Sequence, residues 1–287
     1  MTKLTEVSET ALITLKSRVI ESEKVHPLIR DPVGRDLLEA LMGVLPEELG
    51  NRILKRKLSP LLTQHIALRA RKYDQLCLEF LEEFPEGLLV NLGCGFDTRF
   101  WRLGGGSLKY MELDLPGVVG IKKQILGEKI TYRMLETSIL DRSWIEQVLE
   151  RQAEQVLFIA EGLFMYLPGD QVINILTHLA DSFQNSRLVM EVVTEKYTRG
   201  FRRKMVEKKM RKGAGSTAGD YYQYGIKDAG DLENYAAGFR VRGEWSFFED
   251  PDLRPSFLQL FKHSRSLSKT QYTVIVDINQ PGSMPAD

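Results

Sequence analysis

The apolar positions of the chain follow two different periods. Over residues 1–85 they recur at helical spacing, and Pro27, Pro32, Pro46 and Pro60 divide this part into short elements. From residue 88 onwards, short apolar runs at 88–93, 109–115, 130–135, 155–167 and 186–193 alternate with amphipathic stretches. Such alternation is typical of an α/β protein with a parallel, doubly wound sheet. We therefore predict a helical cap over residues 1–85 and a Rossmann-like core over residues 86–280.

The C-terminal third continues the pattern. After Pro168, apolar residues share one face of a predicted helix: Val172, Ile175, Leu176, Leu179 and Phe183. Further on, residues 231–239 predict a short helix, and residues 244–248 and 271–278 predict two strands. Two late strands suit an antiparallel pair at the end of the sheet.

The first apolar run ends in a glycine loop. Gly93, Cys94 and Gly95 follow it directly, so the chain can turn there while exposing backbone N–H groups to a ligand. A dinucleotide-binding fingerprint requires a third glycine at the position of Thr98. The loop therefore predicts a ligand site but argues against NAD.

Two further runs end in acids. Asp114 stands 21 residues after Gly93, near the spacing at which a carboxylate holds the hydroxyls of a ribose. Glu112 competes for this role from the same face of the strand, and the strand-end position favours Asp114. Glu161 follows the run 155–160, where an open sheet binds its ligand, although it could instead cap the next segment. The acids predict an adenosine-type ligand.

Three segments, 88–103, 110–116 and 158–168, together resemble the leucine carboxyl methyltransferase family, and the resemblance runs over most of the chain. That family contains S-adenosylmethionine-dependent O-methyltransferases, and its bacterial members associated with polyketide methylation are the more similar ones. The resemblance implies a single domain with the class I methyltransferase fold, a mostly parallel seven-stranded sheet with helices on both faces. It also implies S-adenosylmethionine as cofactor and S-adenosylhomocysteine as product.

The resemblance further implies a set of cofactor contacts. An arginine in the segment 65–74 would bind the methionine carboxylate; Arg69 matches by register and Arg71 is the alternative. Asp97 suits the ammonium and sulfonium charges, unless it and Thr98 only cap the next helix. Residues 138–140 would contact adenine by backbone and packing. The predicted cofactor residues are Arg69, Gly93, Cys94, Gly95, Asp97, Thr98, Asp114, Leu115, Ser138, Ile139, Leu140, Glu161, Gly162 and Tyr166.

Acceptor contacts are predicted at both ends of the chain. The first helix of the family folds over the cofactor, so Lys16 and Arg18 are candidates, with plain surface charge as the alternative. A lid insertion near 197–225 holds the basic segment 199–212 and then Tyr221 and Tyr222. These tyrosines could line an entrance for a flat acceptor or cover a core edge. The basic segment could attract an acidic acceptor or form a solvated helix.

Composition narrows the range of partners. The 287 residues hold 39 Lys and Arg against 39 Asp and Glu, so the net charge gives no general attraction to nucleic acid or to anionic membranes. Cys77 and Cys94 fit neither a disulfide framework nor a zinc site, which predicts a reducing, cytoplasmic setting without metal. No run of about 18 apolar residues predicts a membrane span, and no signal peptide is recognised. A small-molecule partner is expected.

The sequence therefore predicts an O-methyltransferase that acts on a carboxylate or hydroxyl oxygen of a small, polyketide-like molecule. An NAD-dependent oxidoreductase and a cofactor-binding protein without turnover are the alternatives. No catalytic residue is assigned, because a carboxylate acceptor needs no base and no motif contains any of the four histidines His26, His65, His178 and His263. The oligomeric state is not predicted.

Overall fold

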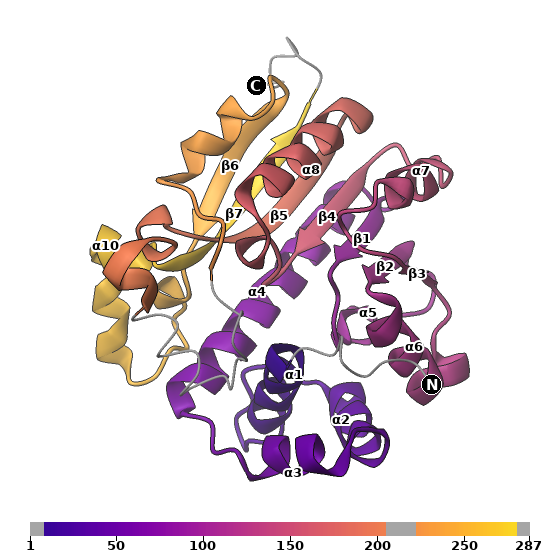
Figure 1. Cartoon of the computed structure of the whole chain (residues 1–287), viewed down its shortest axis with the longest axis vertical. Helices are drawn as coiled ribbons and strands as arrows, with labels where there is room; N and C mark the ends of the chain where they lie inside the picture. Colours follow the sequence, from indigo (N-terminus) through magenta and orange to yellow (C-terminus); the bar gives the residue numbers. More distant parts are fainter. Residues whose placement is uncertain (1–8, 205–221, 280–287) are drawn as a thin grey trace.

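The core of the protein is a seven-stranded sheet with strand order β3-β2-β1-β4-β5-β7-β6 (Figure 1). The computed structural model describes residues 9–204 and 222–279. Strands β1 to β5 are mutually parallel, and β7 runs antiparallel to both β5 and β6. The strands are β1 (Leu88–Leu92), β2 (Tyr110–Asp114), β3 (Arg133–Glu136), β4 (Val156–Ala160), β5 (Ser186–Val193), β6 (Phe239–Trp245) and β7 (Gln271–Ile278). The predicted α/β class and mostly parallel sheet are confirmed.

Helices cover both faces of this sheet, as predicted. Because side chains alternate along β1, Val90 packs on the face covered by α7 (Ser143–Leu149) and α8 (Gly169–Ser182), whereas Leu89 packs on the face covered by α4 (Pro60–Glu83) and α5 (Arg99–Arg102). Further helices are α1 (Glu9–Ser22), α2 (Pro32–Val44), α3 (Glu47–Lys55), α6 (Pro116–Leu126) and α10 (Arg265–Ser268). Short 3₁₀ turns occur at Gly127–Lys129, Phe164–Tyr166, Glu195–Tyr197, Ala229–Asn234, Phe247–Glu249 and Ser256–His263.

The N-terminal helices pack on one another and on the glycine loop. Helices α1, α2 and α3 form one apolar cluster that also takes in Phe96 of the glycine loop and Val118 of α6. Helix α4 instead packs Tyr73 and Phe80 against the sheet, although it also lies against α1. Helix α4 thus contacts both parts, with Leu62 packed on the cap cluster, and the cap sits over the ends of β1 and β2 (Figure 1).

The predicted strand at β7 is confirmed, and the strand predicted next to it differs in its bounds from β6. The predicted strand 244–248 is wrong in its bounds, since β6 ends at Trp245 and Ser246 begins a capping box with Glu249. The predicted helix 231–239 is a 3₁₀ turn at Ala229–Asn234. In β6, exposed positions such as Arg240 alternate with partly exposed ones, so the strand contains few buried apolar residues. The prediction therefore placed the strand too far along the chain, at the aromatic residues that follow.

Some predicted features lie outside the described residues. They lie at residues 205–221, which hold most of the predicted lid insertion, most of the basic segment and Tyr221. Within the described ranges, no helix combines the length and apolar character needed to cross a bilayer.

Candidate functional site

The loop after β1 comes very close to the loop after β4. Gly93 has φ +61°, and a Cβ atom there would lie 2.6 Å from Leu163 Cδ1. Gly95 has φ +52°, and a Cβ on it would lie 3.5 Å from Ala11 of α1. Only glycine fits comfortably at Gly93, for reasons of both conformation and space. The glycine loop therefore lies between the end of β4 and the cap helix.

Asp114 reaches this loop from the end of β2. Its Oδ2 accepts a hydrogen bond from Gly95 N at 2.6 Å, and its Oδ1 accepts one from Leu115 N at 2.7 Å. Burial raises the pKa of Asp114, and the two backbone N–H groups only partly offset this. Glu112, its competitor in the sequence, is fully buried and pairs with Lys122 at 2.6 Å. Of the two acids, Asp114 is thus the one that contacts the glycine loop, and its ribose role stays a prediction.

Arg69 of α4 lies between two carboxylates at the ends of β4 and β5. Its Nε donates to Glu161 Oε1 at 2.8 Å, and its Nη1 donates to both oxygens of Glu191, at 2.8 and 3.0 Å. Although burial alone would lower the pKa of Arg69, the two carboxylates raise it. No described residue accepts a hydrogen bond from Nη2, and a Cβ on Gly162 would lie 3.7 Å from that atom. Arg69 therefore keeps donor capacity beside the loop after β4.

The alternative arginine is held elsewhere. Arg71 donates to Asp250 and to Asp252, each at 2.8 Å. Of the two arginines considered from the sequence, Arg69 is thus the one that contacts the predicted site residue Glu161.

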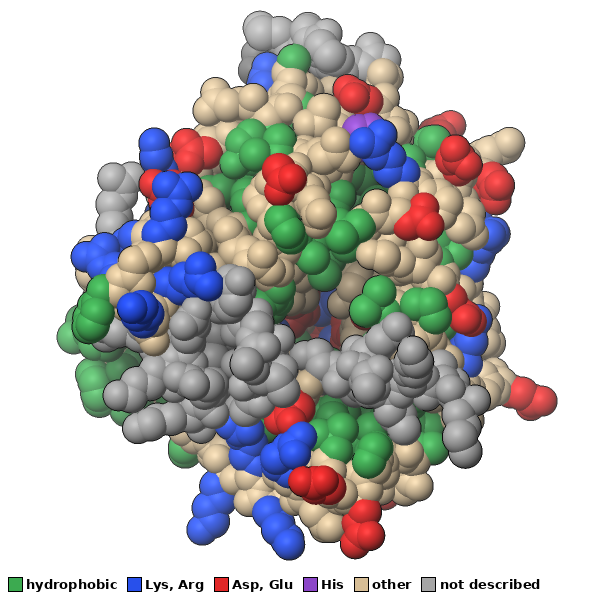
Figure 2. Space-filling model, viewed as in Figure 1, with side chains coloured by type: hydrophobic (Ala, Val, Ile, Leu, Met, Phe, Trp, Pro, Cys, Tyr) green, Lys and Arg blue, Asp and Glu red, His purple; other side chains and the backbone are tan. Residues whose placement is uncertain are grey.

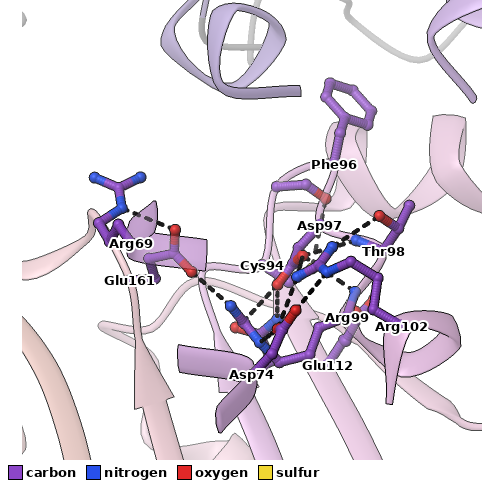
Figure 3. A network of polar contacts seen from close by, with 12 residues as sticks. Arg69, Asp74, Cys94, Phe96, Asp97, Thr98, Arg99, Arg102, Glu112 and Glu161 are labelled. Carbon is purple, nitrogen blue, oxygen red and sulfur yellow. Dashed lines mark hydrogen bonds and ion pairs between the residues drawn. The ribbon is translucent and has the colours of Figure 1, made fainter. Parts of the chain in front are cut away.

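Arg99 is the centre of the polar network in Figure 3. This fully buried guanidinium donates to Asp97 and Glu161, each at 2.6 Å, and to Asp74 at 2.8 Å. The carboxylate of Asp97 also accepts from the N–H groups of Thr98 and Arg99 and lies 3.1 Å from Arg102. Although burial alone would raise the pKa of Asp97, Arg99 and Arg102 hold it well below its usual value. The charge of Asp97 is therefore neutralised within the protein.

Asp97 and Thr98 both have partners within the protein, and their predicted cofactor contacts stay a prediction. Thr98 is the N-cap residue of α5. The Asp97 carboxylate accepts hydrogen bonds from the backbone N–H groups of Thr98 and Arg99 at the start of this helix and pairs with the side chains of Arg99 and Arg102. Thr98 is fully buried and donates its hydroxyl to Asp31 in the cap. Both side chains therefore attach the glycine loop to its neighbouring elements.

Comparisons with known proteins identify the family of the chain. The model of the family described as leucine carboxyl methyltransferase matches residues 11–180. The chain belongs to this family. It is 25% identical over 257 residues to the tetracenomycin polyketide synthesis O-methyltransferase TcmP of Streptomyces glaucescens, with 88% of each chain covered. It is 30% identical over 197 residues to the S-adenosyl-L-methionine-dependent methyltransferase dpfgK of Gibberella zeae, with 66% of this chain and 65% of that one covered.

A solved structure supports the fold. A DUF574 family protein from Streptomyces avermitilis superimposes with a TM-score of 0.54, over 95% of this chain and 98% of that chain, at 13% identity. As a leucine carboxyl methyltransferase family member with relatives of this kind, the protein is an S-adenosylmethionine-dependent methyltransferase. The oxidoreductase alternative is therefore set aside.

In this family member, the loop after β3 is held by its neighbours. Trp144 donates Nε1–H to Ile139 O at 3.0 Å, and Ser138 Oγ accepts from Leu140 N at 3.2 Å. Ile139 is buried and Leu140 is 43% exposed. A cavity of about 390 Å³ lies between this loop and α8, with Arg142 among its lining residues. The three residues predicted to contact adenine thus form a braced turn with one apolar side chain exposed.

The structure gives no support to acceptor binding by Lys16 and Arg18. Lys16 donates its ammonium to three backbone carbonyls at the end of α3, those of Ile53, Leu54 and Arg56, at 2.8 to 2.9 Å. Burial and the nearby Arg56 lower its pKa. The Arg18 guanidinium is buried and pairs with Asp31 at 2.9 Å and with Phe96 O at 2.8 Å. Both side chains hold the cap together, and neither is a plain surface charge.

Tyr166 and Tyr222 face each other beside the end of β5. Their ring centroids are 5.8 Å apart, and Tyr222 is buried, with its hydroxyl donating to Gln271 Oε1 at 3.2 Å. Tyr166 is partly exposed. Figure 2 shows a hollow on this face of the molecule, with acidic and basic side chains at its floor. The prediction that tyrosines line an acceptor site stays a prediction.

Sequence reasoning missed five residues of the network: Asp31, Asp74, Arg99, Arg102 and Glu191. One signal was present for Glu191, because it is a lone acid inside the apolar run 186–193. Arg99 and Arg102 are three residues apart at the start of a short helix, a spacing typical of an exposed face. Their burial depends on Asp74 of α4, which lies on another element.

Proposed function

We propose that the protein transfers the methyl group of S-adenosylmethionine to a carboxylate or hydroxyl oxygen of a small molecule. The transfer would take place at the carboxyl ends of β1, β2 and β4, beneath α1. The name of the relative TcmP, a polyketide O-methyltransferase, supports oxygen as the acceptor atom and a polyketide-like molecule as the acceptor class.

The observation that carries this proposal is the unused side of Arg69. Its Nε and Nη1 serve Glu161 and Glu191, so both N–H groups of Nη2 are left for a carboxylate such as that of the methionine moiety. Gly162, with φ +64°, lets the backbone pass close to this guanidinium. Arg69 therefore fits the role of carboxylate ligand while its own carboxylates keep it in place.

The other predicted contacts fit the rest of the cofactor. Each oxygen of Asp114 uses one lone pair on a backbone N–H, so a second is left for a ribose hydroxyl. Gly93 and Gly95 bring bare backbone to the same edge, and Ile139 and Leu140 offer apolar contact for adenine. Leu115, Ser138, Cys94 and Tyr166 complete the proposed cofactor set around these residues.

The charge balance of the site also suits this donor. The buried network holds five carboxylates, of Asp31, Asp74, Asp97, Glu161 and Glu191, against the four guanidiniums of Arg18, Arg69, Arg99 and Arg102. S-adenosylmethionine carries an ammonium and a sulfonium against one carboxylate. An acidic excess at the site therefore favours its net positive charge.

When bound, the cofactor supplies an electrophilic methyl group on sulfur. The protein has to hold the acceptor oxygen in line behind that methyl group and to exclude water. Tyr166 and Tyr222 would provide a flat apolar wall for this purpose. A carboxylate acceptor is nucleophilic as it stands, whereas a phenol must first lose its proton.

The donor assignment is tested by calorimetric titration with S-adenosylhomocysteine, with NAD as a comparison ligand. The Asp114→Ala variant should bind S-adenosylhomocysteine at least about tenfold more weakly, equivalent to about 1.4 kcal/mol. Glu136 is a matched control, because it is the register partner of Asp114 on β3 and its carboxylate pairs with the exposed Lys123. Glu136→Ala should leave the affinity unchanged. Equal weakening in both variants would contradict the ribose role of Asp114.

The acceptor assignment is tested with methyl-labelled S-adenosylmethionine and a panel of aromatic carboxylic acids and phenols, with aromatic amines and a protein with a free carboxyl terminus as comparison acceptors. Methyl esters release methanol in mild alkali and aryl methyl ethers do not, so the stability of the labelled product identifies the acceptor oxygen. Transfer only to nitrogen acceptors, or only to the carboxyl terminus of a protein, would refute the proposal.

A further inference from the structure

A chain of buried hydrogen bonds leads away from Arg69 on the side opposite Glu161. Glu191 of β5 is 1% exposed and accepts from Arg69. Gln271, the first residue of β7, donates its Nε2 to Glu191 Oε1 at 2.7 Å. Tyr222 then donates its hydroxyl to Gln271 Oε1 at 3.2 Å. The proposed donor clamp is thus connected to the tyrosine wall through two side chains.

The direction of this chain is fixed. An amide has one donor end and one acceptor end, and Glu191 accepts only, so Gln271 must turn its NH₂ towards Glu191 and its oxygen towards Tyr222. Hydrogen bonds in series in a low-dielectric interior polarise one another. A change in the charge around Arg69 therefore alters the strength of the bond at Tyr222.

Tyr222 also begins a segment that lies against the loop after β4. The backbone N–H of Gln223 donates to Met165 O at 2.8 Å, and its side chain donates to Tyr166 O at 2.6 Å. Ile226 N donates to Val193 O at the end of β5, at 3.0 Å. Residues 222–226 are therefore attached to the ends of β4 and β5, next to Glu161 and Glu191.

We propose that Gln271 is a positioning residue that couples donor binding to the acceptor wall. This inference rests on the proposed function, in which Arg69 binds the donor carboxylate. When that carboxylate arrives, Arg69 divides its charge among three carboxylates instead of two. Glu191 then accepts more strongly from Gln271, which holds Tyr222 and the segment 222–226 more firmly. The acceptor wall is thereby completed after the donor has bound.

Hydrogen exchange of backbone amides tests this coupling, with S-adenosylhomocysteine as the probe because it carries the same carboxylate. In the wild-type protein, saturating probe should slow exchange at Gln223, Tyr224 and Ile226 by about threefold to tenfold, the effect of strengthening one hydrogen bond. The Gln271→Met variant keeps the length of the side chain and loses both bonds. It should show no slowing at these amides while retaining the slowing at Cys94 and Gly95, which reports that the probe is bound.

Tyr272→Phe is the matched control. It is the next residue on β7, and its buried hydroxyl has no partner among the described residues. It should behave as wild type. Tyr222→Phe removes only the last bond of the chain, and it should lose the slowing at 222–226 even if Gln271→Met proves too unstable to measure.

The outcomes separate the two proposals. If the probe slows exchange at Cys94 and Gly95 but leaves 222–226 unchanged, or slows 222–226 equally in Gln271→Met and wild type, the coupling is refuted and the donor assignment stands. If the folded wild-type protein does not bind the probe, the donor assignment and the coupling both fail.

Discussion

The buried ion pair between Glu112 and Lys122 gives a stability prediction that can be worked out from the structure. The Lys122 ammonium lies 2.6 Å from Glu112 Oε2, and both side chains are completely buried. Glu112 also accepts hydrogen bonds from Tyr132, at 3.0 Å, and Tyr110, at 3.3 Å. In the Lys122→Met variant, two phenols remain around a carboxylate that has lost its counter-ion. Breaking a buried pair in this way costs about 3–5 kcal/mol.

The same loss follows from proton uptake. Burial already raises the pKa of Glu112, with Lys122 opposing the effect, so removing Lys122 raises it further. The folded variant can then avoid the buried charge by protonating Glu112. Against an unfolded pKa of about 4.3, this costs about 4 kcal/mol at pH 7.5 and about 2 kcal/mol at pH 5.5. Because the folded state binds the extra proton, the stability of the variant falls as pH rises above the unfolded pKa.

Urea unfolding at pH 5.5 and pH 7.5 measures both effects. We expect a loss of about 3–4 kcal/mol at pH 7.5 that is about 2.7 kcal/mol smaller at pH 5.5. The double variant Glu112→Gln with Lys122→Met removes both charges, and Tyr110 and Tyr132 can donate to the new amide oxygen. It should recover most of the stability and lose the pH dependence. The reasoning is refuted if Lys122→Met loses under about 1 kcal/mol at pH 7.5, or if its deficit is the same at both pH values.

Three further substitutions test the structural roles found in the cap and in β7. Lys16→Met removes three hydrogen bonds to carbonyls at the end of α3 and should lower the free energy of unfolding by about 1–2 kcal/mol. Calorimetric titration should show unchanged affinity for S-adenosylhomocysteine, and a clear loss of affinity would instead place Lys16 at the ligand. Arg18→Met leaves the buried Asp31 without its nearest arginine and should lower the free energy of unfolding, measured in urea, by about 3–5 kcal/mol. A decrease of less than about 1 kcal/mol would contradict this role of Arg18. Tyr272→Phe removes a buried hydroxyl that has no hydrogen-bond partner among the described residues. Urea unfolding should therefore show a free energy of unfolding that is unchanged or raised by about 1 kcal/mol, and a lower value would show that the hydroxyl does have a partner.

The fold could be predicted from the sequence where burial dictates a simple pattern. Strands such as β1 are buried on both faces and appear as continuous apolar runs, and α8 shows a clear helical stripe. β6 lies at the edge of the sheet, and its polar residues are exposed on one face. Its pattern is therefore weak, and the prediction shifted it towards the aromatic residues that follow.

The candidate site could be predicted only in part, for a different reason. Gly93, Gly95 and Asp114 act through backbone conformation and position at a strand end, which spacing along the chain reveals. The roles of Asp97 and Arg18 depend on partners from other elements, and spacing carries no information about them. The sequence prediction for Asp97 therefore offered a ligand contact or a helix cap, but not the pairing with Arg99 and Arg102 that neutralises its charge.

The two groups of residues divide the work of building the site. Helix α5 has only four residues, so its own N–H groups and dipole offer little to a ligand. Its arginines instead connect Asp97 of the loop to Asp74 of α4 and to Asp31 of the cap. Because Arg18 also binds Asp31 and the Phe96 carbonyl, the glycine loop is attached to the cap and to α4 by charge. The backbone of the site is therefore fixed before a ligand binds, and Arg69 is held in the same network through Glu161 and Arg99.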